Sequence, residues 1–96
     1  MELDPYVFHT LMRDLVFHDR HPSAMLVYLQ LAYLASRDPG GVVRISHETL
    51  AFETGLSKSA VQGAVRRLRR RRLLRSTRES AVAVPRYEVL RPWGRP

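Results

Sequence analysis

The sequence predicts one mainly α-helical domain with a small antiparallel β-sheet, built from three or four helices and two or three strands. Three observations lead to this prediction. Apolar residues recur at helical spacing in four segments, and each segment begins next to a residue that favours a helix start. Short stretches at 42–45 and 85–90 have the residue types of strands. The chain has 96 residues, 45% of them hydrophobic, which suffices for one modest core.

Composition excludes several classes of function. The chain contains no cysteine, so disulfides and thiolate metal sites are excluded. The longest apolar run, Ala24–Ala35, is interrupted by Gln30. It is shorter than the roughly 20 residues that a membrane span needs. The N-terminal residues carry two acids and no basic region, so no secretory signal is visible. We therefore expect a cytoplasmic protein with no membrane partner.

Positive charge is concentrated in the second half of the chain. The formal net charge is +7; residues 1–48 carry four basic and six acidic side chains, and residues 49–96 carry twelve basic and three acidic ones. Nine basic residues and no acid lie between Lys58 and Arg78. Such clustering is typical of proteins that bind a polyanion. A solvated face in an arginine-rich chain is the alternative interpretation.

The first half is predicted to hold two helices. Asp4 and Pro5 begin the first, which should run to about His18. Its apolar residues at helical spacing are Val7, Phe8, Leu11, Met12, Leu15 and Val16. After a turn at 19–22, the second helix begins at Pro22 or Ser23 and continues to about Ser36. It is apolar on nearly every side, which predicts a central position or a subunit contact.

After a break at 38–41, a helix–turn–helix pattern occupies residues 45–74. Ser46 caps a helix expected over 47–54, and Gly55 ends it in the left-handed conformation. Ser57 caps a helix expected from 58 to about 72. Two crossing helices need small and apolar residues where they meet, and the sequence supplies Leu50, Ala51, Leu56, Val61, Val65 and Leu68. An ordinary helical hairpin with a glycine turn is the alternative.

With these residues, the segment 25–74 resembles the winged helix-turn-helix domains of bacterial and phage transcription regulators and replication initiators. The pattern stands here as Ser46, Leu50–Ala51, Gly55, Ser57, Val61 and Leu68, followed by Leu73–Leu74. The stretch Arg86–Val89 resembles the returning strand of the wing. Arg71 and Arg72 depart from the family, which usually has glycine directly after the recognition helix. We expect a single domain over 1–90 and a tail over 91–96.

The resemblance implies that the helix from Lys58 enters the major groove of double-stranded DNA and reads base edges near its N-terminus. Val61, Val65 and Leu68 form its inward stripe. The opposite face carries Lys58, Ser59, Gln62, Gly63, Arg66 and Arg70. Gln62 suits adenine and Arg66 suits guanine. Gly63 would allow the helix backbone to approach DNA closely, although a glycine tolerated for packing is equally compatible.

Other residues are expected to contact phosphates. Ser46 and Ser57 lie at helix starts, where free N–H groups and hydroxyls suit phosphate oxygens, with capping as their plain structural role. Arginines at the end of the helix and on the predicted wing would reach the backbone. The predicted DNA-binding residues are Ser46, Ser57, Lys58, Ser59, Gln62, Gly63, Arg66, Arg67, Arg70, Arg75, Arg78 and Arg86.

No catalytic set, metal site or cofactor site is expected. His18 and His21, with Asp19 between them, lack a clear further partner beyond His9, and His47 is expected to contact phosphate or solvent. Transcription regulation is the leading hypothesis. The alternatives are the DNA-binding module of a replication initiator, a winged-helix protein-interaction module, and binding of RNA or of nucleic acid without sequence preference. The first two helices also suggest a homodimer, unless their apolar residues are buried within one subunit.

Overall fold

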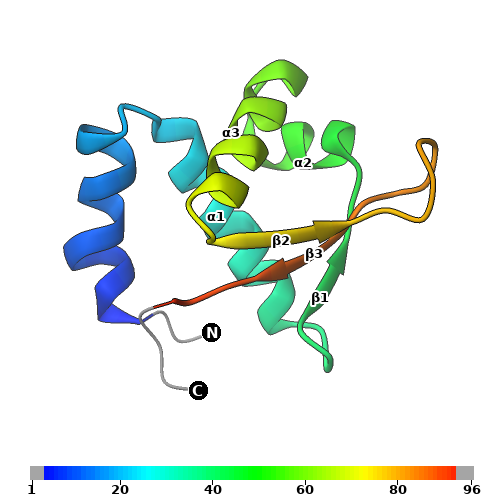
Figure 1. Ribbon diagram of the computed structural model, residues 1–96, viewed down its shortest axis with the longest axis horizontal. Helices are drawn as coiled ribbons and strands as arrows, with labels where there is room; N and C mark the ends of the chain where they lie inside the picture. Colours follow the sequence, from blue (N-terminus) through cyan, green and yellow to red (C-terminus); the bar gives the residue numbers. More distant parts are fainter. Residues whose placement is uncertain (1–3, 93–96) are drawn as a thin grey trace.

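The computed structural model describes residues 4–92, and Figure 1 shows the arrangement of its elements. The predicted class is confirmed: the chain is mainly helical with a small three-stranded antiparallel sheet. A helical segment over residues 5–18, which contains two π-helical stretches, comes first. The other elements are α1 (Pro22–Ser36), β1 (Val42–Arg44), α2 (His47–Thr54), α3 (Lys58–Arg70), β2 (Leu74–Thr77) and β3 (Arg86–Val89). Most of the predicted tail, from residue 93 on, lies outside the described residues.

The N-terminal helix has its predicted bounds but a different winding. Its π-helical stretches are η1 (Val7–Leu11) and η2 (Asp14–His18), in which each N–H bonds five residues back. A π turn is wider than an α turn, so the buried residues are spaced four apart: Val7, Leu11 and Leu15. Phe8 and Val16, which share the apolar spacing of this helix, are 48% and 39% exposed. Of the two alternatives for these apolar residues, burial within one subunit holds for Val7, Leu11 and Leu15 but not for Phe8 and Val16.

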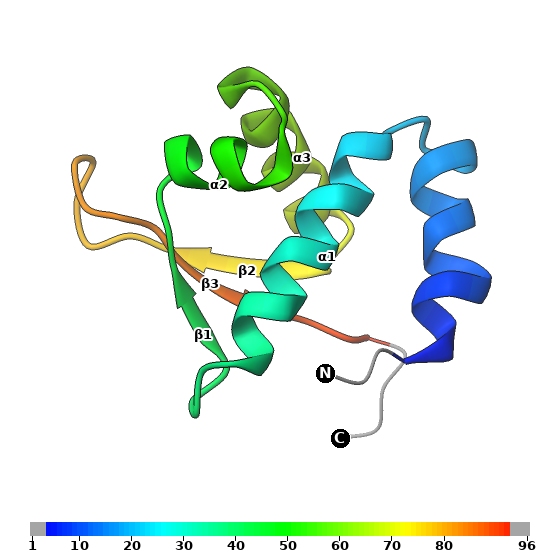
Figure 2. The ribbon, with the colours of Figure 1, turned by 180° about the vertical axis from the view of Figure 1, so that it is seen from behind.

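Helix α1 is central, as its apolar character predicts. It packs against α2, α3, strands β1 and β3, and the second half of the N-terminal helix, and it lies behind the sheet in Figure 1 and before it in Figure 2. Its buried residues are Ala24, Met25, Val27, Tyr28 and Leu31. The Tyr28 hydroxyl donates to the carbonyl oxygen of Leu90, 3.2 Å away. This bond ties the central helix to the chain just after β3.

Local signals set the ends of α2 and the start of α3. The Ser46 hydroxyl accepts from the N–H of Thr49, and the Ser57 hydroxyl accepts from the N–H of Ala60. Gly55, at φ +77°, ends α2 in the left-handed conformation. The predicted crossing is confirmed: Leu50, Ala51, Val61, Val65 and Leu68 are buried, with Leu56 packed against the core.

Helix α3 ends at Arg70, two residues before the predicted end. Arg72 has φ +57°, in the left-handed region. Its N–H bonds to the carbonyl of Arg69, and the N–H of Leu73 bonds to the carbonyl of Leu68, at 3.0 and 2.9 Å. This is a Schellman motif, which usually has glycine at the left-handed position. The pair Arg71–Arg72 therefore ends the helix without glycine at the left-handed position.

The sheet has the strand order β1-β3-β2, with β3 in the middle. Tyr87 of β3 faces Val43 of β1 and Ser76 of β2 across the two antiparallel pairings. Tyr87 and Val43 are buried beneath the helices. The loop between β2 and β3 extends at one end of the molecule, and the N-terminal helix lies at the other end (Figures 1 and 2).

Candidate nucleic-acid interface

Helix α3 has one buried face and one basic face. The buried face consists of Val61, Ala64, Val65 and Leu68, which pack against the rest of the core. On the opposite face, Ser59, Arg66 and Arg70 are exposed, while Gln62 and Gly63 are half-buried. Arg67 is also half-buried, at the border between the two faces. The protein therefore leaves most of the predicted reading face uncovered.

The two serines predicted at helix starts act as caps. The Ser46 hydroxyl lies 3.1 Å from the N–H nitrogen of Thr49, and the Ser57 hydroxyl lies 3.1 Å from that of Ala60. Ser46 also donates to the Thr49 hydroxyl at 3.0 Å. The capping role is confirmed for both residues, and contact with phosphate stays a prediction.

Two of the predicted DNA-binding cations already have acidic partners. Lys58 Nζ lies 3.6 Å from Glu48 Oε1, so α3 begins with an ion pair to α2. Arg75 Nη1 lies 3.4 Å from Glu88 Oε2 across the β2–β3 pairing. Both pairs are partly exposed and therefore weak. Phosphate groups could compete with the two glutamates, but these cations are less available than their number in the sequence suggests.

A contact between α2 and β3 lies beside the basic side of α3. His47 Nε2 is 2.9 Å from the hydroxyl oxygen of Tyr87. Burial, then the positive charges of Arg78 and Lys58, lower the pKa of His47. In the free protein the half-buried ring of His47 is engaged with Tyr87 on one side, and its contact with phosphate stays a prediction.

Positive charges from α3 and from the β2–β3 loop act on the same contact. Burial raises the pKa of Tyr87, while the charges of Arg78 and Arg69 lower it. Arg78 from the loop and Arg69 from α3 therefore both lie close enough to act on one hydroxyl. We call the positive residues around the His47–Tyr87 contact, namely Lys58, Arg69 and Arg78, the basic junction. Its members come from α3 and from the start of the β2–β3 loop.

Sequence reasoning missed Arg69 as a member of this surface, and it missed the pairing of His47 with Tyr87. Arg69 belongs to the arginine run, but helical spacing alone places it at the side of the reading face and gives no signal that its charge acts on Tyr87. His47 and Tyr87 are 40 residues apart, and no local pattern pairs them. The register of the sheet brings them together.

Arg71 has a structural role that the sequence did not indicate. Its guanidinium nitrogens lie 3.7 Å from Asp14 Oδ2 and 3.6 Å from Asp19 Oδ1. The side chain of Asp19 is only 7% exposed, and its Oδ2 has no hydrogen-bond partner among the described residues. Arg71 therefore joins the end of α3 to the N-terminal helix and is not turned toward a ligand.

Within residues 4–92, no three His, Asp or Glu side chains come together in a way that could hold a metal ion. His18 Nδ1 is 3.9 Å from Asp19 Oδ1, whereas His21 Nδ1 lies 3.2 Å from the Ser23 hydroxyl. In the same range, no helix has the length and apolar content to cross a membrane. Searches against family models, curated proteins and solved structures find no match to this chain.

Proposed function

We propose that this chain is a double-stranded DNA-binding protein of the winged helix-turn-helix kind, acting as a transcription regulator. Helix α3 would lie in the major groove, and the β2–β3 hairpin would serve as a basic wing on the DNA backbone. The observation that carries the proposal is the two-sided character of α3. Its aliphatic side is buried against the core, and its opposite side, with Arg66 and Arg70, is open to solvent.

The positions along α3 suit reading of bases. A major groove about 12 Å wide admits one helix, whose N-terminal residues then reach base edges. Ser59, Gln62 and Arg66 occupy successive turns of the uncovered face. Gln62 would pair with adenine and Arg66 with guanine, each through two hydrogen bonds. Arg70, one turn further on, would contact a flanking phosphate.

The basic junction would add affinity for DNA that does not depend on the DNA sequence. Neutralising phosphates releases condensed counterions, so every such contact makes binding more sensitive to salt. Arg78 and Arg69 both act electrostatically on Tyr87, and α3 and the wing would hold adjacent stretches of backbone. This surface favours a nucleic acid over a protein partner, because clustered arginines suit a polyanion. The DNA-binding module of a replication initiator would use the same surface.

We also propose that the protein forms a homodimer through its first two helices. Phe8 and Phe17 on the N-terminal helix are 48% and 72% exposed, and Leu26 and Tyr33 on α1 are also exposed. Burying these side chains against a second copy of the chain would remove apolar surface from water, which favours association. Sedimentation at micromolar concentration should show a dimer, and a monomer would contradict this part of the proposal.

Competition binding tests the function. A labelled random-sequence duplex is bound by the protein and displaced by unlabelled duplex or by a structured RNA hairpin. We expect duplex DNA to displace the label at much lower concentration than RNA. Equal displacement by RNA would contradict the proposal.

The same assay locates the interface with two matched arginine variants. Arg66→Gln removes a charge from the uncovered face of α3, while Arg13→Gln removes one from an exposed position on the N-terminal helix. We expect Arg66→Gln to weaken duplex binding by about tenfold or more and Arg13→Gln to leave it unchanged. Equal effects of the two variants would mean that α3 is not the binding surface.

A further inference from the structure

The outer face of the sheet carries two arginines directly opposite each other. In the β1–β3 pairing Arg44 is the partner of Arg86, and in the β2–β3 pairing Thr77 is the partner of Arg86. All three side chains are exposed. Opposite Cβ atoms in such a row lie about 4.5–5.5 Å apart, and like charges there destabilise a sheet. The row would gain stability if an anion lay between the two guanidinium groups.

In the neighbouring row of the same face, an acidic side chain of the protein balances the positive charge. There Arg75 lies opposite Glu88 and forms the ion pair described above. Among residues 4–92, no acid lies within ion-pair distance of Arg44 or Arg86. One row of the outer face is therefore neutralised, and the other is left positive.

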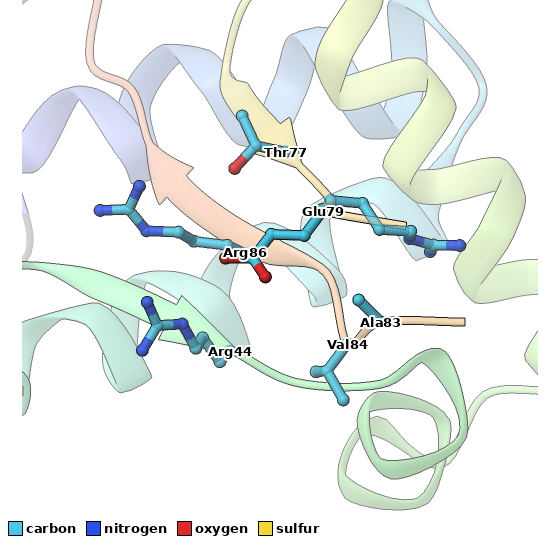
Figure 3. Close-up of a pocket in the computed structure, with 7 residues that line it drawn as sticks. Arg44, Thr77, Glu79, Ala83, Val84 and Arg86 are labelled. Atoms are coloured by element: carbon cyan, nitrogen blue, oxygen red, sulfur yellow. The ribbon is translucent and has the colours of Figure 1, made fainter. Parts of the chain in front are cut away.

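A surface hollow of about 660 Å³ adjoins the positive row, and Figure 3 shows it. Its lining includes Arg44, Thr77, Arg78, Glu79, Val84 and Arg86. The guanidinium groups of Arg44 and Arg86 point the same way along the sheet (Figure 3). Glu79 extends back from the β2–β3 loop toward Arg86 in the same view. The lining thus contains three arginines and one carboxylate, so the hollow carries a net positive charge.

A second acid near the row is already engaged. Asp38 lines a smaller hollow of about 330 Å³ together with Arg44 and Arg86. Its Oδ2 accepts the N–H groups of Gly40 and Val42 at 2.9 and 3.0 Å. This carboxylate closes the turn before β1 and lies beyond ion-pair distance of both guanidinium groups.

We infer that Arg44, Arg86 and the Thr77 hydroxyl form a binding site for a phosphate group, separate from the surface of α3. Guanidinium groups bind phosphate oxygens through paired, charge-assisted hydrogen bonds, and a threonine hydroxyl adds a third donor. The phosphate belongs either to the DNA backbone, in which case the inference rests on the proposed function, or to a free phosphorylated molecule. The competing explanation is that β1 is an edge strand, where charged side chains prevent pairing with other molecules.

Titration with inorganic phosphate tests the site directly. The ¹⁵N-labelled protein is titrated at constant ionic strength, and the arginine Nε–Hε signals are assigned by their loss in Arg44→Gln and Arg86→Gln. We expect saturable shifts at these two arginines and at Thr77, with affinity about tenfold lower in either variant. Glu79→Gln should raise the affinity, and Arg13→Gln should not change it. Shifts that do not saturate, or equal affinity in Arg44→Gln, would overturn the site and leave the edge-strand explanation.

Titration of the same variants with duplex DNA at several salt concentrations identifies the source of the phosphate. If it is the DNA backbone, Arg44→Gln lowers the slope of log affinity against log salt by about 0.9, and Arg13→Gln does not. An unchanged slope together with saturable inorganic phosphate binding supports the site with a free phosphorylated ligand. If the protein binds duplex DNA but shows neither saturable phosphate binding nor a change in the salt slope, the site is overturned and the proposed function stands. If it binds inorganic phosphate but not duplex DNA, the proposed function is overturned and the site stands.

Discussion

His47 and Tyr87 join the start of the helix–turn–helix segment to the middle strand of the sheet. His47 Nε2 lies 2.9 Å from the Tyr87 hydroxyl, and Tyr87 is only 1% exposed. Lys58, Arg69 and Arg78 all act electrostatically on this pair. The contact therefore ties the start of α2 to β3 within reach of positive charges from α3 and the β2–β3 loop.

Because of this contact, we expect the free energy of unfolding to depend on pH near neutrality. Burial and nearby cations lower the pKa of His47 in the folded state below 6.5, so the unfolded state binds the proton more readily. The contribution of His47 is therefore present above about pH 6.5 and is lost as the pH falls from there toward the folded-state pKa. Denaturant unfolding at pH 7.5 and 5.5 should show a larger loss for the wild type than for His47→Gln. The same loss in both proteins would contradict the prediction.

The bridge from α3 to the N-terminal helix predicts coupling between Arg71 and Asp19. Arg71→Ala should lower the free energy of unfolding by about 1–3 kcal/mol, because the nearly buried Asp19 carboxylate loses its cationic neighbour. Asp19→Asn in the same background should restore part of that loss. A double-mutant cycle measures the coupling energy. A value below about 0.5 kcal/mol would mean that the two side chains act independently.

We expect Gly63→Ala to have opposite effects on the stability of the protein and on its affinity for duplex DNA. A methyl group there would lie 3.8 Å from Arg66 Nη2 and 3.9 Å from His21 Nε2, which is ordinary contact. The fold therefore does not require glycine, and Gly63→Ala should stabilise α3 by about 1 kcal/mol. If the helix backbone approaches DNA closely, the same variant should weaken duplex binding. Increased stability with unchanged affinity would show that Gly63 has no role in binding.

The left-handed conformation of Arg72 predicts that glycine is better at this position. Side chains with a Cβ atom cost about 1 kcal/mol there relative to glycine. Arg72→Gly should therefore raise the free energy of unfolding by about that amount. Arg72→Ala is the matched control, because it removes the charge and keeps the Cβ atom. Equal effects of the two substitutions in thermal unfolding would assign the change to charge and not to backbone conformation.

The parts of the fold that could be predicted from the sequence are those with local causes. Ser46, Gly55 and Ser57 act within one helical turn of their own positions, and they place α2 and the start of α3 correctly. The end of α3 depends on where Leu73 enters the core, and arginines favour a helix on either side of that point. The π-helical winding of residues 5–18 also has no signal in apolar spacing.

The candidate site also has features that the sequence predicts and features that it does not. The sequence reveals which residues are basic and, by helical spacing, which of them share the uncovered face of α3. It does not reveal which cations are neutralised, because Glu48 and Glu88 reach Lys58 and Arg75 across elements. Nor does it reveal that Arg44 lies opposite Arg86, because that depends on the register of two strands far apart in the chain.

The central claim is that the uncovered face of α3 reads bases, and Gln62 tests it most directly. Duplexes selected from a random pool are titrated beside scrambled duplexes of the same composition, with wild-type protein and with Gln62→Ala. We expect the substitution to cost about 1–3 kcal/mol on the selected duplex and much less on the scrambled one. Equal losses on the two duplexes would mean that Gln62 reads no base and that α3 does not bind as proposed.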